Sequence, residues 1–481
     1  MAEDYDLIVI GAGAAGLTAA GFAGRVGAKV ALVEREKLGG DCTWAGCVPS
    51  KALLKVAKVA HTARTASRYG ITASEPTVDM KAVREHLREV VQEVYQHETP
   101  EVYGDKYHVE VVKGAARFAD THTVQVDDQR LTGKKIVVAS GARAAVPPVP
   151  GLDSVAYKTN RDIFDNDRLP EHLLVMGAGP VGTEIAQAYA RLGAQVTLMD
   201  LALLPRDEPE VAATLEPILR AEGVRFIHSL VDAAQQDGDQ ITLTLRSGET
   251  ISGDMLFVAV GRSPNVRDLW LENAGVHYTE RGIPVDQYLR TNVPHIYAVG
   301  DCTTGPKFTH YAGFQGGIAG RNAIVPLVNS SGHDPLNPWV TFTDPEVAHV
   351  GLTEAEAFEQ YGDKVKTYMF SLLHGDRSVA EGDTDGFIKI TYRGGGQILG
   401  VTIVAARAGE MITEFTLAMK HGFGLSGITG TIHPYPSYSD IVKKASSSLM
   451  IDELLRGPAG VALGAASAAA LTSNGVDKQR R

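Results

Sequence analysis

The chain has 481 residues, which is too long for a single hydrophobic core and predicts two to four domains. Its 44% hydrophobic and 21% charged content is ordinary for a globular protein, and its net charge of −11 argues against nucleic acid as a main partner. Three cysteines cannot form a secreted disulfide framework, and no apolar run is long enough to span a membrane, so we expect a cytoplasmic protein without a membrane segment.

The first expected element is a buried parallel strand over residues 5–10, which leaves no room for a signal or transit peptide before it. The glycines Gly11, Gly13 and Gly16 follow, then an alanine-rich helix and a second strand that ends at Glu34. Such glycines permit a tight turn and let a pyrophosphate approach the helix N-terminus. Glu34 comes 18 residues after Gly16 (34 − 16), where an acid accepts ribose hydroxyls. This unit predicts a dinucleotide site.

Two cysteines, Cys42 and Cys47, come directly after this unit, and Lys51 follows them. The four residues between them can form one turn of helix, which would bring both sulfurs within disulfide reach. In a chain of this composition such a pair favours redox or metal chemistry over a structural disulfide, although two buried free cysteines are the simpler alternative. A zinc site is weakly supported because the third cysteine, Cys302, is far away, and we assign no metal-ligating residues.

A second glycine pattern, with Gly177, Gly179 and Gly182, follows a strand and precedes a helix. The strand over 195–200 then ends in Asp200, again 18 residues after the last glycine (200 − 182). Two nucleotide-binding folds in series could hold a flavin and a nicotinamide, the usual pair for passing a hydride to sulfur.

The remaining segments fit a chain of several domains. We expect an excursion with helical periodicity over 80–97, a linker at 147–151, and strands followed by helices over 338–453. The Ala/Gly/Ser-rich end after residue 456 is expected to be disordered.

Over residues 5–453 the chain resembles the FAD-dependent pyridine nucleotide–disulfide oxidoreductases, the family of dihydrolipoamide dehydrogenase, glutathione reductase and mercuric reductase. The resemblance rests on the segment 39–51, which is similar to the family's redox helix, and on three shorter motifs. These are the flavin-contact turn at 138–142 with Ser140 and Gly141, the end of the nicotinamide domain at 260–265 with Gly261, and the second flavin motif at 296–301 with Asp301.

The resemblance implies an α/β fold with two Rossmann-like domains, for FAD and NAD(P), and a C-terminal α+β dimerisation domain. The implied boundaries are 1–155 and 285–335 for FAD, 156–284 for NAD(P), 336–453 for dimerisation and 454–481 for a disordered tail.

The resemblance also implies roles for single residues. Cys47 is the sulfur nearest the flavin and Cys42 the interchange thiol that meets the acceptor. Lys51 lies beside the flavin, paired with Glu184, and Asp301 accepts a hydrogen bond from the ribityl chain. A solvated Lys51 and a helix-capping Asp301 are the structural alternatives.

Asp200 favours NADH, because a carboxylate at this position binds the 2′-hydroxyl of NAD and repels the 2′-phosphate of NADP. Arg206 lies close enough in the sequence to leave NADPH as an alternative.

The chain departs from the family near its C-terminus. Disulfide-handling members place a catalytic histidine there, with an acid five residues later, and a partner subunit supplies both. Aligned on Pro436, this chain has Tyr435 at the base position and keeps Asp440 (440 − 435 = 5), while His433 occupies the place of the family's first histidine. A phenol with a pKa near 10 is a poor base at pH 7, so His433 remains an alternative base.

Mercuric reductases similarly carry tyrosine at this position, so the sequence favours a mercuric-reductase-like branch. It lacks the vicinal cysteine pair typical of their C-terminal tails, which would impair delivery of Hg(II). We therefore expect a homodimeric enzyme of cell redox homeostasis that passes electrons from NAD(P)H through FAD to Cys42–Cys47 and on to a metal ion or other small acceptor. A dihydrolipoamide dehydrogenase, another small disulfide reductase and a flavoprotein redox sensor are the alternatives.

Overall fold

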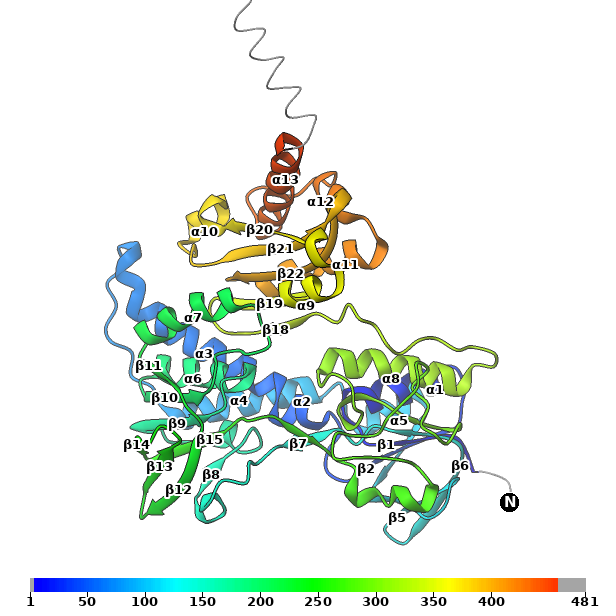
Figure 1. The fold of residues 1–481 in the computed structure, drawn as a ribbon. Helices are drawn as coiled ribbons and strands as arrows, with labels where there is room; N and C mark the ends of the chain where they lie inside the picture. Colours follow the sequence, from blue (N-terminus) through cyan, green and yellow to red (C-terminus); the bar gives the residue numbers. More distant parts are fainter. Residues whose placement is uncertain (1–3, 457–481) are drawn as a thin grey trace, which may run out of the picture. The chain divides into compact units, whose positions relative to one another are not determined.

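The computed structural model of the chain describes residues 4–456 (Figure 1). Within this range the chain divides into two compact units, one made of residues 4–205 and 216–334, the other of residues 206–215 and 335–456. Helix α7 (Pro209–Ala221) contributes residues to both units. We describe each unit by itself.

The first sheet of the larger unit has the strand order β3-β2-β1-β6-β5-β4, with β17 paired to β6. The pairs among β3, β2, β1, β6 and β17 are parallel, whereas β4 and β5 form an antiparallel extension. Leu7, Ile8 and Val9 in β1 are fully buried, as a continuous apolar run in a parallel sheet predicts. The strands are β1 (Tyr5–Ile10), β2 (Val30–Glu34), β3 (Val109–Lys113), β4 (Ala116–Phe118), β5 (Thr123–Val126), β6 (Gln129–Val138) and β17 (Ile296–Ala298).

The second sheet of this unit is parallel, in the order β11-β10-β9-β15-β8. Its strands are β8 (Tyr157–Lys158), β9 (His172–Met176), β10 (Gln195–Asp200), β11 (Val224–His228) and β15 (Met255–Val258). An antiparallel sheet accompanies it, made of β12 (Val231–Asp237), β13 (Gln240–Leu245) and β14 (Thr250–Gly253). Strands β7 (Ala142–Ala144) and β16 (Arg262–Pro264) pair into a short antiparallel ribbon. Along the chain, β7 follows β6 of the first sheet and β16 follows β15 of the second.

Small residues let the helices of this unit pack closely. A Cβ on Gly316 in α8 would lie 2.1 Å from the carbonyl oxygen of Ala15 in α1, so the two helices touch through backbone, and they lie side by side in Figure 1. The helices are α1 (Ala14–Arg25), α2 (Gly40–Ala45), α3 (Cys47–Thr65), α4 (Met80–Tyr95), α5 (Pro100–Tyr107), α6 (Pro180–Leu192) and α8 (Thr309–Ile324).

The smaller unit is built on an antiparallel sheet in the order β18-β19-β22-β21-β20, with helices that follow the strands in sequence. The strands are β18 (Trp339–Thr341), β19 (Glu346–Gly351), β20 (Lys366–Ser371), β21 (Phe387–Arg393) and β22 (Gln397–Ala405). The helices are α9 (Glu354–Tyr361), α10 (Asp376–Glu381), α11 (Ala408–His421), α12 (Gly424–Thr429) and α13 (Tyr438–Arg456). Phe415, Ile403 and Val442 are among its fully buried core residues.

Several element predictions are confirmed. Strand β1 covers the predicted 5–10, β10 covers 195–200, and the excursion forms α4 from residue 80 to residue 95. Among residues 4–456, every helix is too short or too polar to be a candidate bilayer-spanning segment.

Two expectations need correction. The residues between the cysteines do not form one continuous turn: α2 ends at Ala45 and α3 begins at Cys47. Gly46 interrupts the helix because the chain folds back there, and a Cβ on it would lie 2.7 Å from the carbonyl oxygen of Asp41. Helix α13 also continues through residues 454–456, which were expected in the tail. Residues 457–481 of that expected tail lie outside the described range.

Candidate active site

The first glycine turn has the geometry of a dinucleotide cradle. Gly11 has φ +99°, and a Cβ on Gly16 would lie 1.8 Å from the carbonyl oxygen of Gly11, so both positions require glycine. Gly13 faces open space, with only the Cα of Gly40 at 4.0 Å, and it begins α1 without a side-chain cap. The Glu34 carboxylate accepts the backbone N–H of Ala12 at 2.7 Å.

The second turn repeats this geometry. Gly177 has φ +101°, and a Cβ on Gly182 would lie 1.8 Å from its carbonyl oxygen. A Cβ on Gly179 would meet nothing within 4 Å, and α6 also begins without a side-chain cap. The Asp200 carboxylate accepts the backbone N–H of Ala178 at 2.9 Å. Open space in front of an uncapped helix N-terminus fits a pyrophosphate, so both turns suit the predicted dinucleotides.

Ser140 and Gly141 form a turn that is tied to the segment at 260–265. The Ser140 hydroxyl donates to the carbonyl oxygen of Asn265 at 2.7 Å, and the Asn265 amide donates back to the carbonyl oxygen of Ser140 at 3.0 Å. Gly141 and Gly261 have φ values of +67° and +136°, and a Cβ on either would meet nothing within 4 Å. The backbone at both positions is therefore open to a ligand.

Cys42 and Cys47 are unjoined and half-buried, and each thiol shifts the pKa of the other. The hydrogen bond from Cys42 lowers the pKa of Cys47 to about 6; Thr309 and Lys51 act in the same direction and burial opposes them. The pKa of Cys42 is raised, first by its hydrogen bond to Cys47 and then by burial. At neutral pH Cys47 is thus the thiolate and Cys42 the thiol.

Thr309 is a site residue that sequence reasoning missed. It begins helix α8, and its hydroxyl lies 3.2 Å from the Cys47 sulfur. The two residues are 262 positions apart and no motif contains Thr309, so only the packing of α8 brings them together.

Lys51 and Glu184 form the predicted ion pair, with the ammonium nitrogen 2.9 Å from the carboxylate oxygen. The Glu184 side chain is only 6% exposed, whereas that of Lys51 is 36% exposed. The carboxylate can therefore fix the direction of the lysine, while solvent weakens the energy of the pair.

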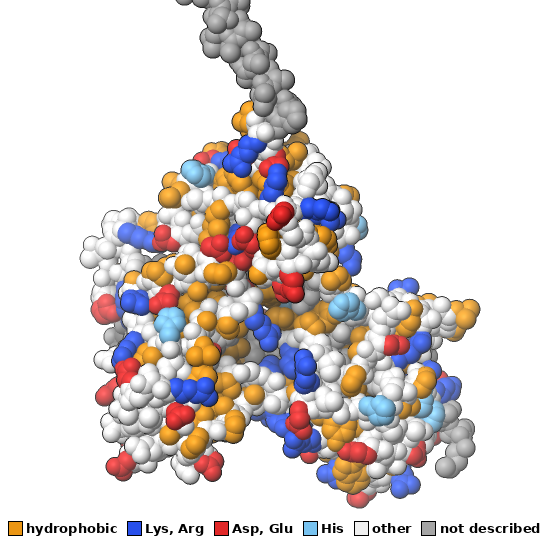
Figure 2. Space-filling view, viewed as in Figure 1, with side chains coloured by type: hydrophobic (Ala, Val, Ile, Leu, Met, Phe, Trp, Pro, Cys, Tyr) orange, Lys and Arg blue, Asp and Glu red, His pale blue; other side chains and the backbone are white. Residues whose placement is uncertain are grey.

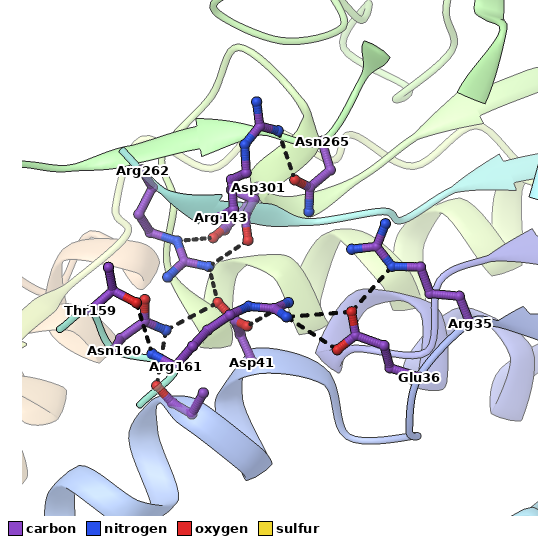
Figure 3. Close-up of polar contacts among 12 residues, drawn as sticks. Arg35, Glu36, Asp41, Arg143, Thr159, Asn160, Arg161, Arg262, Asn265 and Asp301 are labelled. Carbon is purple, nitrogen blue, oxygen red and sulfur yellow. Dashed lines mark hydrogen bonds and ion pairs between the residues drawn. The ribbon is translucent and has the colours of Figure 1, made fainter. Parts of the chain in front are cut away.

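Asp301 is held by Arg262, whose role the sequence did not reveal. The Arg262 Nε lies 3.1 Å from the Asp301 carboxylate, and its Nη2 lies 2.6 Å from that of Asp41 (Figure 3). Burial raises the pKa of Asp301, and Arg262 opposes that shift. Next to it, Cys302 is fully buried and its thiol faces the carbonyl oxygens of Val138 and Val299, as a structural cysteine would.

The smaller unit separates the two alternative bases. The His433 side chain is 4% exposed: one ring nitrogen lies 2.5 Å from the Glu414 carboxylate and the other 2.9 Å from the carbonyl oxygen of Thr431. Tyr435 is 70% exposed, and its ring lies 5.9 Å from the ammonium of Lys444.

Asp440 lies in the first turn of α13, 3.9 Å from the same ammonium. Lys444 also pairs with Asp376, and the pKa of Asp376 is lowered chiefly by Lys444 and to a smaller extent by Tyr435. The structure thus brings Tyr435 and Asp440 to one lysine and leaves His433 with its own carboxylate.

Comparisons with known proteins place this geometry in a family. Residues 5–316 match the pyridine nucleotide-disulphide oxidoreductases, and residues 337–446 match the dimerisation domain of the same family. The chain belongs to the pyridine nucleotide-disulphide oxidoreductases. This confirms the predicted family and α/β fold class and makes the protein a flavoprotein oxidoreductase.

Individual relatives have different activities. The chain is 37% identical to a mercuric reductase from Streptomyces lividans, over 93% of this chain and 97% of that one. It is 35% identical to a dihydrolipoyl dehydrogenase from Geobacillus stearothermophilus, over 92% and 96%. Among solved structures it resembles the HOCl-induced flavoprotein disulfide reductase RclA from Escherichia coli, with a TM-score of 0.83, 27% identity and coverage of 92% and 99%. A Cu(II) complex of RclA matches equally well.

Proposed function

We propose that this oxidoreductase uses NADH to reduce the Cys42–Cys47 disulfide and that the dithiol then reduces a soft metal ion, Hg(II) first among them. The first glycine turn, Ser140, Gly141 and Asp301 would hold FAD, which when bound would supply two-electron transfer between the nicotinamide and the disulfide. With two protons the disulfide becomes the dithiol. Two electrons from the sulfurs would then reduce Hg(II) to Hg(0), which restores the disulfide and releases the two protons to water.

The pairing of Cys42 with Cys47 carries this proposal. Thr309 and Lys51 favour the thiolate at Cys47, while Cys42 keeps its proton, so the two sulfurs differ in reactivity as a relay requires. Thiolates are the ligands that soft metal ions prefer. Lys51, directed by Glu184, would stabilise negative charge beside Cys47.

The C-terminal residues favour a metal ion over a disulfide as acceptor. A disulfide acceptor needs a proton donor for its leaving thiol, whereas a metal ion does not. Both ring nitrogens of His433 are engaged, and the base position of the family holds the phenol Tyr435 in place of an imidazole. The mercuric reductase relative supports Hg(II), and the Cu(II) complex of RclA makes Cu(II) the second ion to test.

NADH is the proposed nucleotide. Asp200 ends β10 beside the second glycine turn, where a carboxylate repels a 2′-phosphate. The ratio of kcat/KM for NADH and NADPH measures this directly, and a preference for NADPH would count against it.

We further propose a cytoplasmic homodimer in which Tyr435 and Asp440 of one subunit reach the cysteines of the other. The dimerisation-domain match at 337–446 supports the dimer. We also propose that residues 1–155 and 285–335 hold FAD and that residues 156–284 hold NAD(P). The division of the strands between two parallel sheets supports this proposal.

The decisive experiment is an acceptor screen with the purified flavoprotein. NADH oxidation is measured with Hg(II), Cu(II), lipoamide and glutathione disulfide, in wild type and in Cys42→Ser, Cys47→Ser and Cys302→Ser. We expect metal-dependent turnover that either of the first two substitutions abolishes and that the buried Cys302→Ser control retains. Turnover with lipoamide alone would instead support the dihydrolipoyl dehydrogenase alternative, which the 35% identical relative favours.

A further inference from the structure

Helix α2, which carries Cys42, depends on contacts from outside itself. It has only six residues, Gly40–Ala45, and its N-cap Gly39 offers no side-chain hydrogen bond. Helices this short do not form alone, because nucleation costs more than one or two backbone hydrogen bonds return. The position of Cys42 is therefore set by whatever holds α2.

Asp41, the residue before Cys42, is one of the side chains of α2 that hydrogen-bond outside the helix, with Thr43 and Trp44. Its carboxylate receives the Arg262 guanidinium at 2.6 Å and the Asn160 amide at 3.4 Å, and the Arg161 guanidinium lies 3.8 Å away (Figure 3). Asn160 also donates to the carbonyl oxygen of Ala45 at 3.0 Å. One amide group thus contacts the side chain near the start of α2 and the backbone at its end.

The anchoring groups come from one edge of the second nucleotide-binding sheet. Asn160 follows the carboxyl end of the edge strand β8, and Arg262 begins β16, four residues after the carboxyl end of the neighbouring strand β15 (262 − 258). Arg262 is itself fixed, since it also binds the Asp301 carboxylate at 3.1 Å and the carbonyl oxygen of Ala142 at 3.0 Å. The carboxyl ends of parallel strands are where such sheets bind nucleotides.

We propose that Asp41 is a positioning residue for Cys42: with Asn160 and Arg262 it fixes the helix that carries this thiol to the carboxyl edge of the second nucleotide-binding sheet. The inference rests on the proposed role of Cys42 as the acceptor-facing thiol. Loss of the anchor lets α2 open, which exposes Cys42 to small reagents and misplaces it for its acceptor.

The test measures how readily α2 opens in the flavoprotein after reduction with dithiothreitol. Iodoacetamide alkylation of Cys42 is measured by peptide mass spectrometry over a pH series, and hydrogen–deuterium exchange is measured for residues 40–45. Asp41→Asn should accelerate alkylation of Cys42 about tenfold. The reason is that loss of one charge-assisted hydrogen bond makes the open state of α2 about tenfold more populated. Asn160→Ala should accelerate it about threefold, and both variants should speed exchange in 40–45.

The choice of variants distinguishes the effect of removing a charge next to Cys42 from the effect of removing the contacts that hold α2. Asn160→Ala alters no charge, so its pH midpoint for alkylation should equal that of wild type while its rate rises. Asp41→Glu keeps a carboxylate for Arg262 and should restore most of the wild-type rate. Glu280→Gln removes the carboxylate of another 2.6 Å ion pair, with Arg267, and should change neither readout.

Wild-type rates and exchange in Asn160→Ala would overturn the inference, as would an Asp41→Asn effect that is only a shift of the pH midpoint. If Asp41→Asn does not fold, Asn160→Ala alone is sufficient to test the inference. Faster exchange in 40–45 in the variants, together with acceptor turnover that survives Cys42→Ser, would uphold the anchor and count against the proposed function instead.

Discussion

At the scale of single residues, the contrast between the two cysteines comes from their immediate neighbours. Cys47 receives hydrogen bonds from Cys42 and Thr309 and lies within the field of Lys51, whereas the pKa of Cys42 is raised by the thiolate beside it and by burial. A donor that favours the charged form of a thiol lowers its pKa. The hydroxyl of Thr309 therefore belongs to the chemistry of the pair.

We predict that Thr309→Val moves the alkylation midpoint of Cys47 upward from about 6. The sign follows because the valine removes a donor to the thiolate, so the charged form becomes less favourable and less of it exists at pH 6. The pH profile of Cys47 alkylation in the reduced protein measures the midpoint. Thr309→Ser keeps the hydroxyl and is the control; an unchanged midpoint in the valine variant would remove Thr309 from the site.

The second residue-scale prediction separates Tyr435 from His433. Because Tyr435 is 70% exposed and the side chain of His433 only 4%, the phenol is the group that can reach an acceptor. Tyr435→Phe should therefore lower the rate of acceptor reduction by about tenfold and leave flavin reduction by NADH unchanged. His433→Asn should instead cost about 1–3 kcal/mol of stability, because it leaves the Glu414 carboxylate without its partner.

Stopped-flow spectroscopy of the two half-reactions and chemical denaturation measure these effects. If His433→Asn abolished acceptor reduction while Tyr435→Phe changed neither half-reaction, His433 rather than Tyr435 would be the residue that acts on the acceptor.

At the scale of elements, two glycines of the second glycine turn serve different purposes. Gly182 lets helix α6 approach the end of β9, where a Cβ would collide with the carbonyl oxygen of Gly177 at 1.8 Å. Gly179, three residues earlier, has open space in front of it and φ −73°, which any residue can adopt. One glycine thus serves the fold and the other leaves room for a ligand.

This difference predicts opposite outcomes for two similar substitutions. Gly182→Ala should destabilise the protein by about 1–3 kcal/mol, because the methyl group has no space. Gly179→Ala should leave the melting temperature within about 1 °C, yet weaken NADH binding about tenfold or more by occupying the space for the pyrophosphate. Calorimetry and NADH titration measure both, and equal loss of stability in the two variants would contradict the interpretation.

At the scale of the whole molecule, the smaller unit carries large apolar side chains on its surface. Large apolar residues with more than half of their surface exposed there include Leu373 (64%), Leu417 (56%), Phe423 (56%) and Ile432 (92%). Figure 2 shows apolar side chains among charged ones on the visible face of this unit. These residues lie in the region that matches the family's dimerisation domain, which makes them candidates for the proposed contact between subunits.

We predict that Ile432→Asp converts a dimer into a monomer. A charge placed at this 92% exposed apolar position would have to be buried in the contact, which is unfavourable without a partner. The monomer should keep flavin reduction by NADH and lose acceptor turnover, because Tyr435 and Asp440 could no longer reach another subunit's cysteines. Sedimentation velocity and the two half-reactions measure this.

Leu327→Asp, at an equally exposed position in the larger unit, is the control. A dimeric Ile432→Asp variant with normal turnover would place the contact elsewhere.

The sequence by itself determined the elements that depend on local pattern. The glycine turns, the strands ending in Glu34 and Asp200, and the position of the cysteines after the first nucleotide-binding unit could all be predicted, because backbone sterics and apolar runs act over a few residues. The pairing of Lys51 with Glu184, 133 positions apart, was reached only through the family resemblance.

Only the tertiary structure decided which side chains surround those elements. It placed Thr309 beside Cys47, Arg262 between Asp41 and Asp301, and His433 against Glu414. Asp41 and Arg262 are 221 positions apart, and their contact depends on how two sheets and a six-residue helix pack together. Local sequence carries no trace of such contacts, because packing brings distant side chains together without imposing any spacing between them along the chain.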